Sequence, residues 1–242
     1  MPLFRLSERL DFPPAWLARS DGLLCIGGDL SAQRILLAYE NGIFPWFSEN
    51  EPILWWSPDP RLVLFPGNIK ISKSLNKKIK GNFFHLTIDH AFEETILSCS
   101  KPRKKEYAGT WLVEEMIQAY VQLHKLGYAH SIETWKEDRL VGGLYGICLG
   151  GIFFGESMFS FENDASKIAL ATLAGHLKQH RFDLIDCQVT TNHLLSMGAT
   201  EISRNSYLDI IQRSIKRKDI GNIWNPDIPL TIQQPAYYTE KS

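Results

Sequence analysis

Residues 129–157 read AHSIETWKEDRLVGGLYGICLGGIFFGES, and this stretch decides the fold. Three apolar runs, AHSIETW, LVGGLYGICL and IFFGES, are separated by the turn segments KEDR and GG. Short runs rich in β-branched and aromatic residues, with such turns between them, are typical of consecutive antiparallel strands. We therefore predict a three-stranded meander here.

Helical patterns lie on both sides of this meander, and one more strand, LIDCQV, follows it at residues 184–189. The expected helices cover residues 89–100, 114–126, 165–179, a short segment at NHLLSMG, and residues 206–216. This order predicts an α+β protein whose helices cover the faces of a sheet, as in the acetyltransferase-like (GNAT) architecture. An order of elements carries no chemistry by itself, so the function must come from particular residues.

The first 66 residues are rich in Pro, Trp and Gly, as in FPPAW, GIFPWF and PILWWSPDPRLVLFP. One helix interrupts them, with Ser31 as its N-cap and Gly42 as its stop. We predict a small aromatic-rich N-terminal domain at residues 1–66 and a GNAT-like domain at residues 67–242.

The charge of the chain is unevenly distributed. Its 242 residues carry a formal net charge of −1, which excludes a uniformly basic nucleic-acid binder. Residues 68–105, however, carry a net charge of +6, and residues 140–201 a net charge of −3. These charges are either solvated surface or a polyanion-facing surface together with a cation-attracting cleft.

The cysteines and the apolar segments indicate a cytoplasmic protein. Cys25, Cys99, Cys148 and Cys187 lie far apart without a C-x-x-C pair, which favours free thiols in a reducing compartment. The first thirty residues contain no secretory apolar segment. Residues 140–155 carry no charge, but their length and six glycines do not suit a membrane span.

Two acidic side chains stand where apolar residues would be expected. Glu156 follows the apolar run GGIFF, and a buried carboxylate must be paired, hydrated or used. It is therefore either a capping or salt-bridged residue, or a partner for a cationic substrate group. Asp186 interrupts LIDCQV, and Gln188 returns to the same face two residues later. This pair forms either an internal network between sheet and helix or a functional site.

Common cofactor motifs are incomplete. His176 and His180 have the spacing of a zinc helix, but HLKQH lacks the glutamate of H-E-x-x-H and an evident third ligand. The glycine-rich segments match neither a Walker loop nor a dinucleotide fingerprint, and Ser157 lacks the second glycine of G-x-S-x-G. FSFENDASK also lacks the phosphate loop of a CoA-dependent acyltransferase. We expect no metal, ATP, dinucleotide or CoA.

Ten motifs in order resemble the leucyl/phenylalanyl-tRNA-protein transferase family, the bacterial aminoacyltransferases of the N-end rule pathway. They are GLLCIGGDLS, AYENGIFPWF, PILWWSPDPR, GTW, AHSIETW, LVGGLYG, FFGESMFS, ASK, LIDCQ and HLLSMGATEI. The likeness runs from Gly22 to Arg204 and is weakest between Asn68 and Tyr107.

The resemblance implies a small N-terminal domain followed by a GNAT-like catalytic domain. The family moves leucine, or less readily phenylalanine, from the 3′ end of a tRNA to a protein that begins with arginine or lysine. The implied partners are leucyl-tRNA, phenylalanyl-tRNA and such proteins. The aminoacyl ester already holds the activation energy, so the resemblance implies no metal or other cofactor. We expect a monomer.

The resemblance also implies the site residues. Asp186 and Gln188 match the catalytic pair, and Glu156 and Met158 match the substrate-site glutamate and methionine. An apolar pocket for the leucyl side chain would be formed by Leu144, Phe153, Met158 and Ile185. Aromatic residues in motifs near the 3′ adenosine and the acceptor are Tyr39, Trp46, Trp111 and Tyr120. Thr191 and Leu173 depart from the family pattern at the pocket rim.

The basic segment is expected to hold tRNA through its phosphates. Its candidate residues are Lys70, Lys73, Lys77, Lys78, Lys80, Arg103, Lys104 and Lys105. In the cleft, Glu156 would attract the cationic acceptor. The Gln188 carbonyl oxygen, oriented by Asp186, would align the amine, because a neutral amide is too weak a base to take its proton.

Two other functions fit the same residues. The first is a non-catalytic N-degron binding module in which Glu156 and Asp186 form a cation pocket. The second is a peptidoglycan-type aminoacyl-tRNA-dependent transferase, which would use the same donor with a cell-wall acceptor.

Overall fold

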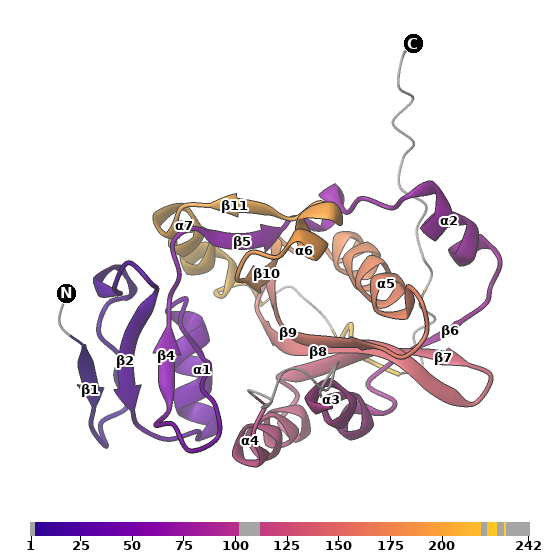
Figure 1. Ribbon diagram of the computed structural model, residues 1–242. Helices are drawn as coiled ribbons and strands as arrows, with labels where there is room; N and C mark the ends of the chain where they lie inside the picture. Colours follow the sequence, from indigo (N-terminus) through magenta and orange to yellow (C-terminus); the bar gives the residue numbers. More distant parts are fainter. Residues whose placement is uncertain (1–2, 102–111, 219–221, 227–229, 231–242) are drawn as a thin grey trace, which may run out of the picture.

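The computed structural model describes residues 3–101, 112–218, 222–226 and 230, which form two sheets flanked by helices (Figure 1). Within these residues the smaller sheet has four strands, in the order β1 (Phe4–Leu6), β2 (Leu23–Gly27), β4 (Leu54–Trp56) and β3 (Phe44–Pro45). The larger sheet has seven, in the order β11 (Thr200–Ile202), β5 (Arg61–Leu64), β10 (Leu184–Gln188), β9 (Ile152–Ser160), β8 (Arg139–Leu149), β7 (Ala129–Lys136) and β6 (His85–Ile88).

The smaller sheet packs with helix α1 (Ala32–Glu40) around buried aromatic residues. As predicted, Ser31 caps this helix: its hydroxyl accepts the Arg34 N–H at 3.4 Å. Gly42, at a φ of +72°, lies just beyond the helix end, where a side chain would be strained. Trp55 is fully buried and donates its indole N–H to the Gly27 carbonyl at 2.8 Å.

The predicted meander is confirmed as β7, β8 and β9, which pair antiparallel. Strand β9 is longer than predicted, because it continues past IFFGES to Ser160. Glu156 therefore lies within a strand rather than at its end. Strand β10 joins β9 in parallel, whereas the other neighbouring pairs of the described sheet are antiparallel.

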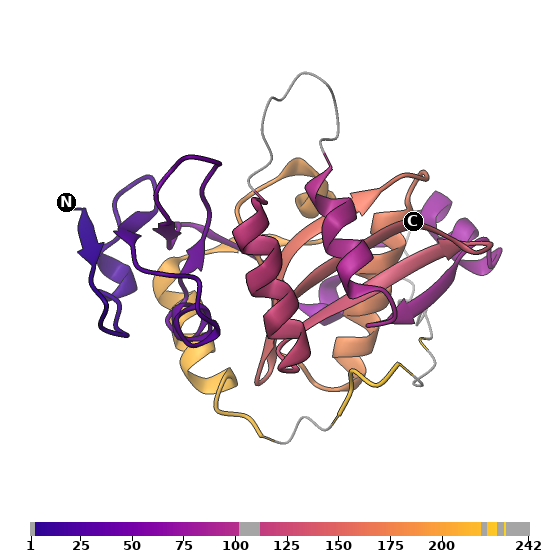
Figure 2. The same ribbon diagram turned by 90° about the horizontal axis from the view of Figure 1, so that it is seen from below.

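Helices cover both faces of the larger sheet, which confirms the α+β class. Helix α5 (Ala165–Gln179) lies on one face, and α3 (Phe92–Ser100) and α4 (Glu114–Lys125) lie on the other (Figures 1 and 2). Further elements are η1 (Ala15–Leu17), η2 (Pro66–Asn68), α6 (Asn192–Ser196) and α7 (Arg204–Ser214). None of the described helices is long and apolar enough to cross a membrane.

The chain enters the larger sheet early, because β5 at residues 61–64 lies between β10 and β11. One hydrophobic core cluster contains residues from around both sheets. Within it, Tyr39 of α1 packs edge-on against Phe154 of β9, with 5.0 Å between ring centroids. This contact brings α1 to the edge of the site described below. The division into domains at residue 66 stays a prediction.

Candidate active site

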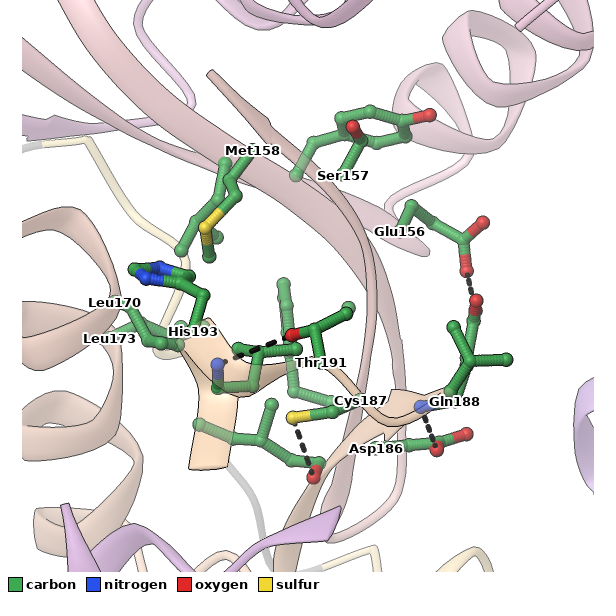
Figure 3. A pocket seen from close by; sticks show the side chains of 17 residues that line it. Glu156, Ser157, Met158, Leu170, Leu173, Asp186, Cys187, Gln188, Thr191 and His193 are labelled. Atoms are coloured by element: carbon green, nitrogen blue, oxygen red, sulfur yellow. Dashed lines mark hydrogen bonds between the residues drawn. The ribbon is translucent and has the colours of Figure 1, made fainter. Parts of the chain in front are cut away.

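A pocket of about 380 Å³ opens between β8, β9, β10, α5 and α6. Its lining residues are Leu144, Tyr145, Phe153, Gly155, Glu156, Ser157, Met158, Leu170, Leu173, Ile185, Asp186, Cys187, Gln188, Val189, Thr191, His193 and Leu194. Figure 3 shows Glu156, Asp186 and Gln188 at one end of it, and Met158 and His193 at the other. The pocket thus has a polar end and an apolar body.

The four residues predicted to hold the leucyl side chain all line this pocket. Strand register places them in pairs: Leu144 lies opposite Met158 across β8 and β9, and Ile185 lies opposite Phe153 across β10 and β9. Leu170 and Leu173 of α5 complete the wall. The geometry brings these side chains together, while their contact with a leucyl group remains a prediction.

The end of β10 carries an irregularity that sets the polar end. Asp186 pairs with Val63 and Gln188 with the adjacent Leu62, so Cys187 is an extra residue in the strand. Gln188 has a φ of +62°, in the left-handed region that non-glycine residues rarely adopt. Such backbone strain persists where surrounding contacts hold it, and it concentrates at functional sites.

Asp186 is held by an internal ion pair. Its carboxylate is fully buried and accepts two hydrogen bonds from the buried Arg61, at 2.9 Å from Nε and 2.6 Å from Nη2. Tyr207 of α7 donates a third at 2.6 Å. Burial works to lower the pKa of Arg61, but the Asp186 carboxylate outweighs it and the pKa is raised. The internal network between sheet and helix is therefore present at Asp186.

Asp186 does not orient the side chain of Gln188 as expected. Its Oδ1 accepts the backbone N–H of Gln188 at 2.9 Å, which supports the strained turn. The side-chain amide of Gln188 instead donates to Glu156 Oε1 at 2.8 Å. Because Nε2 faces the carboxylate, Oε1 of Gln188, at the opposite edge of the planar amide, points away from Glu156.

Glu156 joins three elements through hydrogen bonds. Its Oε1 lies 2.6 Å from the hydroxyl of Tyr39 and its Oε2 lies 2.8 Å from that of Tyr120. The two tyrosine hydroxyls are 2.7 Å apart. These three contacts need three protons, and the two phenols supply only two. A proton on the Glu156 carboxyl completes the set.

The pKa of Glu156 agrees with this proton count. Burial raises it to about 7, the nearby Asp186 carboxylate adds to the rise, and the hydrogen bonds from Tyr39, Tyr120 and Gln188 oppose it. Glu156 can therefore change charge near neutral pH, beside a carboxylate whose charge Arg61 balances.

Glu156→Gln should therefore stabilise the protein in a pH-dependent way. The folded state keeps the Glu156 proton up to about pH 7, whereas an ordinary glutamate releases it near 4.5. Stability contributed by this proton is present below pH 4.5 and is lost as pH rises through 7. We expect the variant to gain about 3 kcal/mol in free energy of unfolding at pH 8, and almost nothing at pH 4. Denaturant titrations at both pH values measure this, and an equal gain at both would contradict it.

Only some of the predicted aromatic residues lie at the site. Tyr39 and Tyr120 reach the site through Glu156. Trp46 is 43% exposed, tilts against Trp56 at 5.8 Å between ring centroids, and does not line the pocket. Trp111 lies outside the described residues.

The basic segment includes a helix that the sequence did not reveal. Helix α2 (Lys73–Lys80) has a narrow apolar stripe: Leu75 is buried and Ile79, one turn later, packs against the same core cluster. Lys70, Lys73 and Lys77 are exposed, whereas Lys78 forms an ion pair with Asp164 at 2.7 Å. Lys80 is exposed as well. The predicted residues Arg103, Lys104 and Lys105 lie outside the described part of the chain.

Sequence reasoning missed several residues of the site, among them Arg61, Tyr145 and Tyr207. Arg61 and Tyr207 complete the hydrogen-bond network of Asp186. The signal that could have revealed Arg61 was an arginine at the start of the apolar run RLVLF. Tyr145 is fully buried and lines the pocket, and its hydroxyl has no hydrogen-bond partner among the described residues. No comparable signal marked it within LVGGLYG.

A largely apolar pocket with a few convergent polar groups and one acid of raised pKa defines a ligand-binding enzyme site on an α+β fold. Two family models match the chain: leucyl/phenylalanyl-tRNA protein transferase over residues 63–212, and the N-terminal domain of that transferase over residues 28–59. The chain belongs to the leucyl/phenylalanyl-tRNA protein transferase family. The resemblance found in its motifs is thereby confirmed.

The sequences of proteins named leucyl/phenylalanyl-tRNA--protein transferase match most of the chain. The protein of Desulforapulum autotrophicum is 58% identical, over 93% of this chain and 98% of its own length. That of Syntrophobacter fumaroxidans is 56% identical, over 93% and 96%. Among solved structures, L-PGS from Bacillus licheniformis has a TM-score of 0.41 at 10% identity, over 81% of this chain and 72% of that chain. The family assignment rests on the sequence matches.

Proposed function

We propose that this protein transfers leucine, or phenylalanine, from aminoacyl-tRNA to the α-amino group of proteins that begin with arginine or lysine, and so creates an N-degron. The observation that carries the proposal is the apolar pocket whose polar end holds Glu156 and Gln188. A pocket of this kind fits an unbranched-at-Cβ aliphatic or aromatic side chain beside a reacting ester. Shape alone limits discrimination against a misfitting methyl group to about 1–3 kcal/mol.

The acceptor amine must be neutral when it attacks the ester carbonyl. Gln188 Oε1 faces away from Glu156 and accepts a hydrogen bond from the amine, which aligns its lone pair with the carbonyl carbon. A C–N bond forms and the ester C–O bond breaks. The departing ribose oxygen receives the amine proton, directly or through a water. Alignment of two large substrates supplies much of the acceleration.

Glu156 selects the acceptor by charge. In its ionised form it is the uncompensated negative group of the pocket, because Asp186 is paired with Arg61. This charge attracts a basic N-terminal residue and repels an acidic one. In this proposal Glu156 alone attracts the acceptor. The cation pocket of an N-degron binding module would instead use both Glu156 and Asp186.

Leucyl-tRNA with labelled leucine, mixed with a peptide that begins with arginine, tests the proposal directly. We expect label on the peptide α-amine, and none on an acetylated peptide or one that begins with aspartate. Peptide binding without transfer would instead favour the N-degron binding module. Transfer to a cell-wall acceptor but not to the peptide would favour a peptidoglycan-type transferase.

We also propose that the protein acts as a cytoplasmic monomer. None of the four cysteines, all in the described part of the chain, forms a disulfide, which suits a reducing compartment. Sedimentation of the purified chain measures its oligomeric state, and a dimer at assay concentration would contradict this part of the proposal.

Helix α2 is proposed to contact tRNA phosphates. Reversing the exposed Lys73 and Lys77 to glutamate is expected to raise the dissociation constant of leucyl-tRNA and to reduce its salt slope by about one unit per lysine. Filter binding at several salt concentrations measures both quantities. Lys125→Glu, at an exposed position at the end of α4, is the matched control. Equal salt slopes for the parent and the double variant would contradict a phosphate contact here.

A further inference from the structure

A short segment near the end of the chain, residues 222–226, packs behind the apolar pocket. Ile223 is 2% exposed, and Trp224 packs against the same core cluster, which also contains the pocket residues Leu144 and Phe153. Trp224 itself does not line the pocket. A residue in this place can shape the pocket without touching a ligand.

Two histidines hold this segment in place. His176 of α5 donates a hydrogen bond from Nε2 to the Ile223 carbonyl at 2.9 Å, because a carbonyl oxygen can only accept. The imidazole of His130 in β7 stacks on the Trp224 indole, with 4.2 Å between ring centroids and 7° between the ring planes. His176, whose spacing from His180 is that of a zinc helix, thus binds another part of the chain.

The plane of the His130 ring is fixed by hydrogen bonds at both of its edges. Its Nδ1 lies 2.6 Å from Asp89 Oδ2, and its Nε2 lies 3.2 Å from the Gly127 carbonyl oxygen. Asp89 in turn accepts the backbone N–H of Ser131 at 2.7 Å. Trp224 therefore stacks on a surface that cannot rotate away from it.

The Trp224 indole also packs against Phe153, which is fully buried and forms part of the pocket wall. Their ring centroids are 5.6 Å apart, within the range of a packed aromatic pair. On another side, the Phe153 ring lies against the backbone at Gly146, where a Cβ would come within 2.6 Å of it. Phe153 is thus held between β8 and Trp224, and it separates Trp224 from the pocket.

We propose that Trp224 is a positioning residue that determines specificity: it holds the Phe153 ring against the pocket and so sets the size of the donated side chain that fits. This inference rests on the proposed function. Protein interiors are close-packed, so an indole that fills the space behind Phe153 denies this ring any other position. A pocket wall held in this way favours leucine over a larger side chain.

Trp224→Ala should therefore change the preferred amino acid as well as the rate. The vacated volume lets the Phe153 ring withdraw from the pocket, which admits phenylalanine and holds leucine loosely. The measured quantity is kcat/KM for phenylalanyl-tRNA divided by kcat/KM for leucyl-tRNA, with an arginine-starting peptide as acceptor. We expect this ratio to rise roughly tenfold. Trp224→Phe keeps a ring beside Phe153, so its ratio should stay close to that of the parent.

The ratio is decisive because a poorly folded variant loses activity with both donors alike. Trp16→Ala is the matched control: it removes a tryptophan of η1 that is 62% exposed and does not line the pocket, and it should leave the ratio unchanged. An equal shift in this control would overturn the inference. Should Trp224→Ala not fold, Trp224→Leu provides the same comparison with a smaller loss of volume.

Phe153→Leu shows whether Trp224 acts through Phe153. Residues that act through one contact are not additive, so adding Trp224→Ala to Phe153→Leu should shift the ratio much less than Trp224→Ala does in the parent. Shifts that simply multiply would overturn the inference, and so would an unchanged ratio in Trp224→Ala. Absence of transfer from both donors in the parent protein would count against the proposed function instead.

Discussion

Arg61→Met is expected to lower the free energy of unfolding by about 3–5 kcal/mol, because it leaves the Asp186 carboxylate buried without its cation. In the parent protein, the Arg61 guanidinium donates twice to Asp186 and lies over the rings of Phe44 and Tyr207, at 4.7 Å and 4.6 Å from their centroids. Methionine keeps part of the apolar volume and removes the charge. Urea unfolding at pH 7 measures the loss.

Two comparisons identify the cause of that loss. Adding Asp186→Leu to Arg61→Met removes both charges, and it should recover most of the stability because two apolar side chains can replace a buried ion pair. Arg19→Met breaks the exposed pair with Asp21, whose side chains are 44% and 47% exposed, and should cost less than about 1 kcal/mol. If Arg61→Met cost no more than Arg19→Met, the ion pair would not be what stabilises the end of β10.

Gln188→Ala and Gln188→Gly are both expected to reduce the single-turnover rate of leucine transfer by about a hundredfold or more, because each removes the amide that aligns the amine. The measurement uses saturating leucyl-tRNA and peptide, so that weaker binding does not contribute. A near-normal rate in Gln188→Ala would show that the amide does not align the amine. Gln188→Glu, which puts a second carboxylate beside Glu156, should also be slow.

The same two variants report the strain at residue 188. At a φ of +62°, alanine is strained in the folded state and glycine is not, so the glycine variant should be the more stable by about 1 kcal/mol. At an ordinary strand position the order would be reversed. Equal stabilities would mean that the left-handed turn costs nothing.

Local periodicity explains how much of the fold could be predicted. The meander at residues 129–157 followed from alternating apolar runs and turn residues, and α5 from its long apolar helical pattern. Helix α2 was missed because its eight residues hold only two apolar side chains, Leu75 and Ile79, among four lysines, which is a weak periodic signal. Strand β5 was missed because RLVLF lies far from its partners in sequence, and neither neighbour is adjacent along the chain.

The candidate site, too, could be predicted from the sequence only in part. Leu144, Phe153, Met158 and Ile185 were predicted from the family resemblance, and they line one pocket. Alternation alone would place Phe153 and Met158, five residues apart, on opposite faces of β9, but the register shift at Glu156 brings both to the pocket. The different environments of Asp186 and Glu156 were not predictable. An extra residue in β10 breaks the alternation between Asp186 and Gln188, and a bulge leaves little signal in a single sequence.

The amino-acid sequence by itself determined the family, the strands of the meander and the identity of the pocket residues, because these depend on short-range pattern and motif. Only the tertiary structure decided which acid stays available: Arg61 neutralises Asp186 from 125 positions away, whereas Glu156, whose pKa burial raises, is contacted by Tyr39 from 117 positions away. The physical reason is that strand and helix periods fix the face on which a side chain lies, whereas burial and partners from distant segments fix its charge.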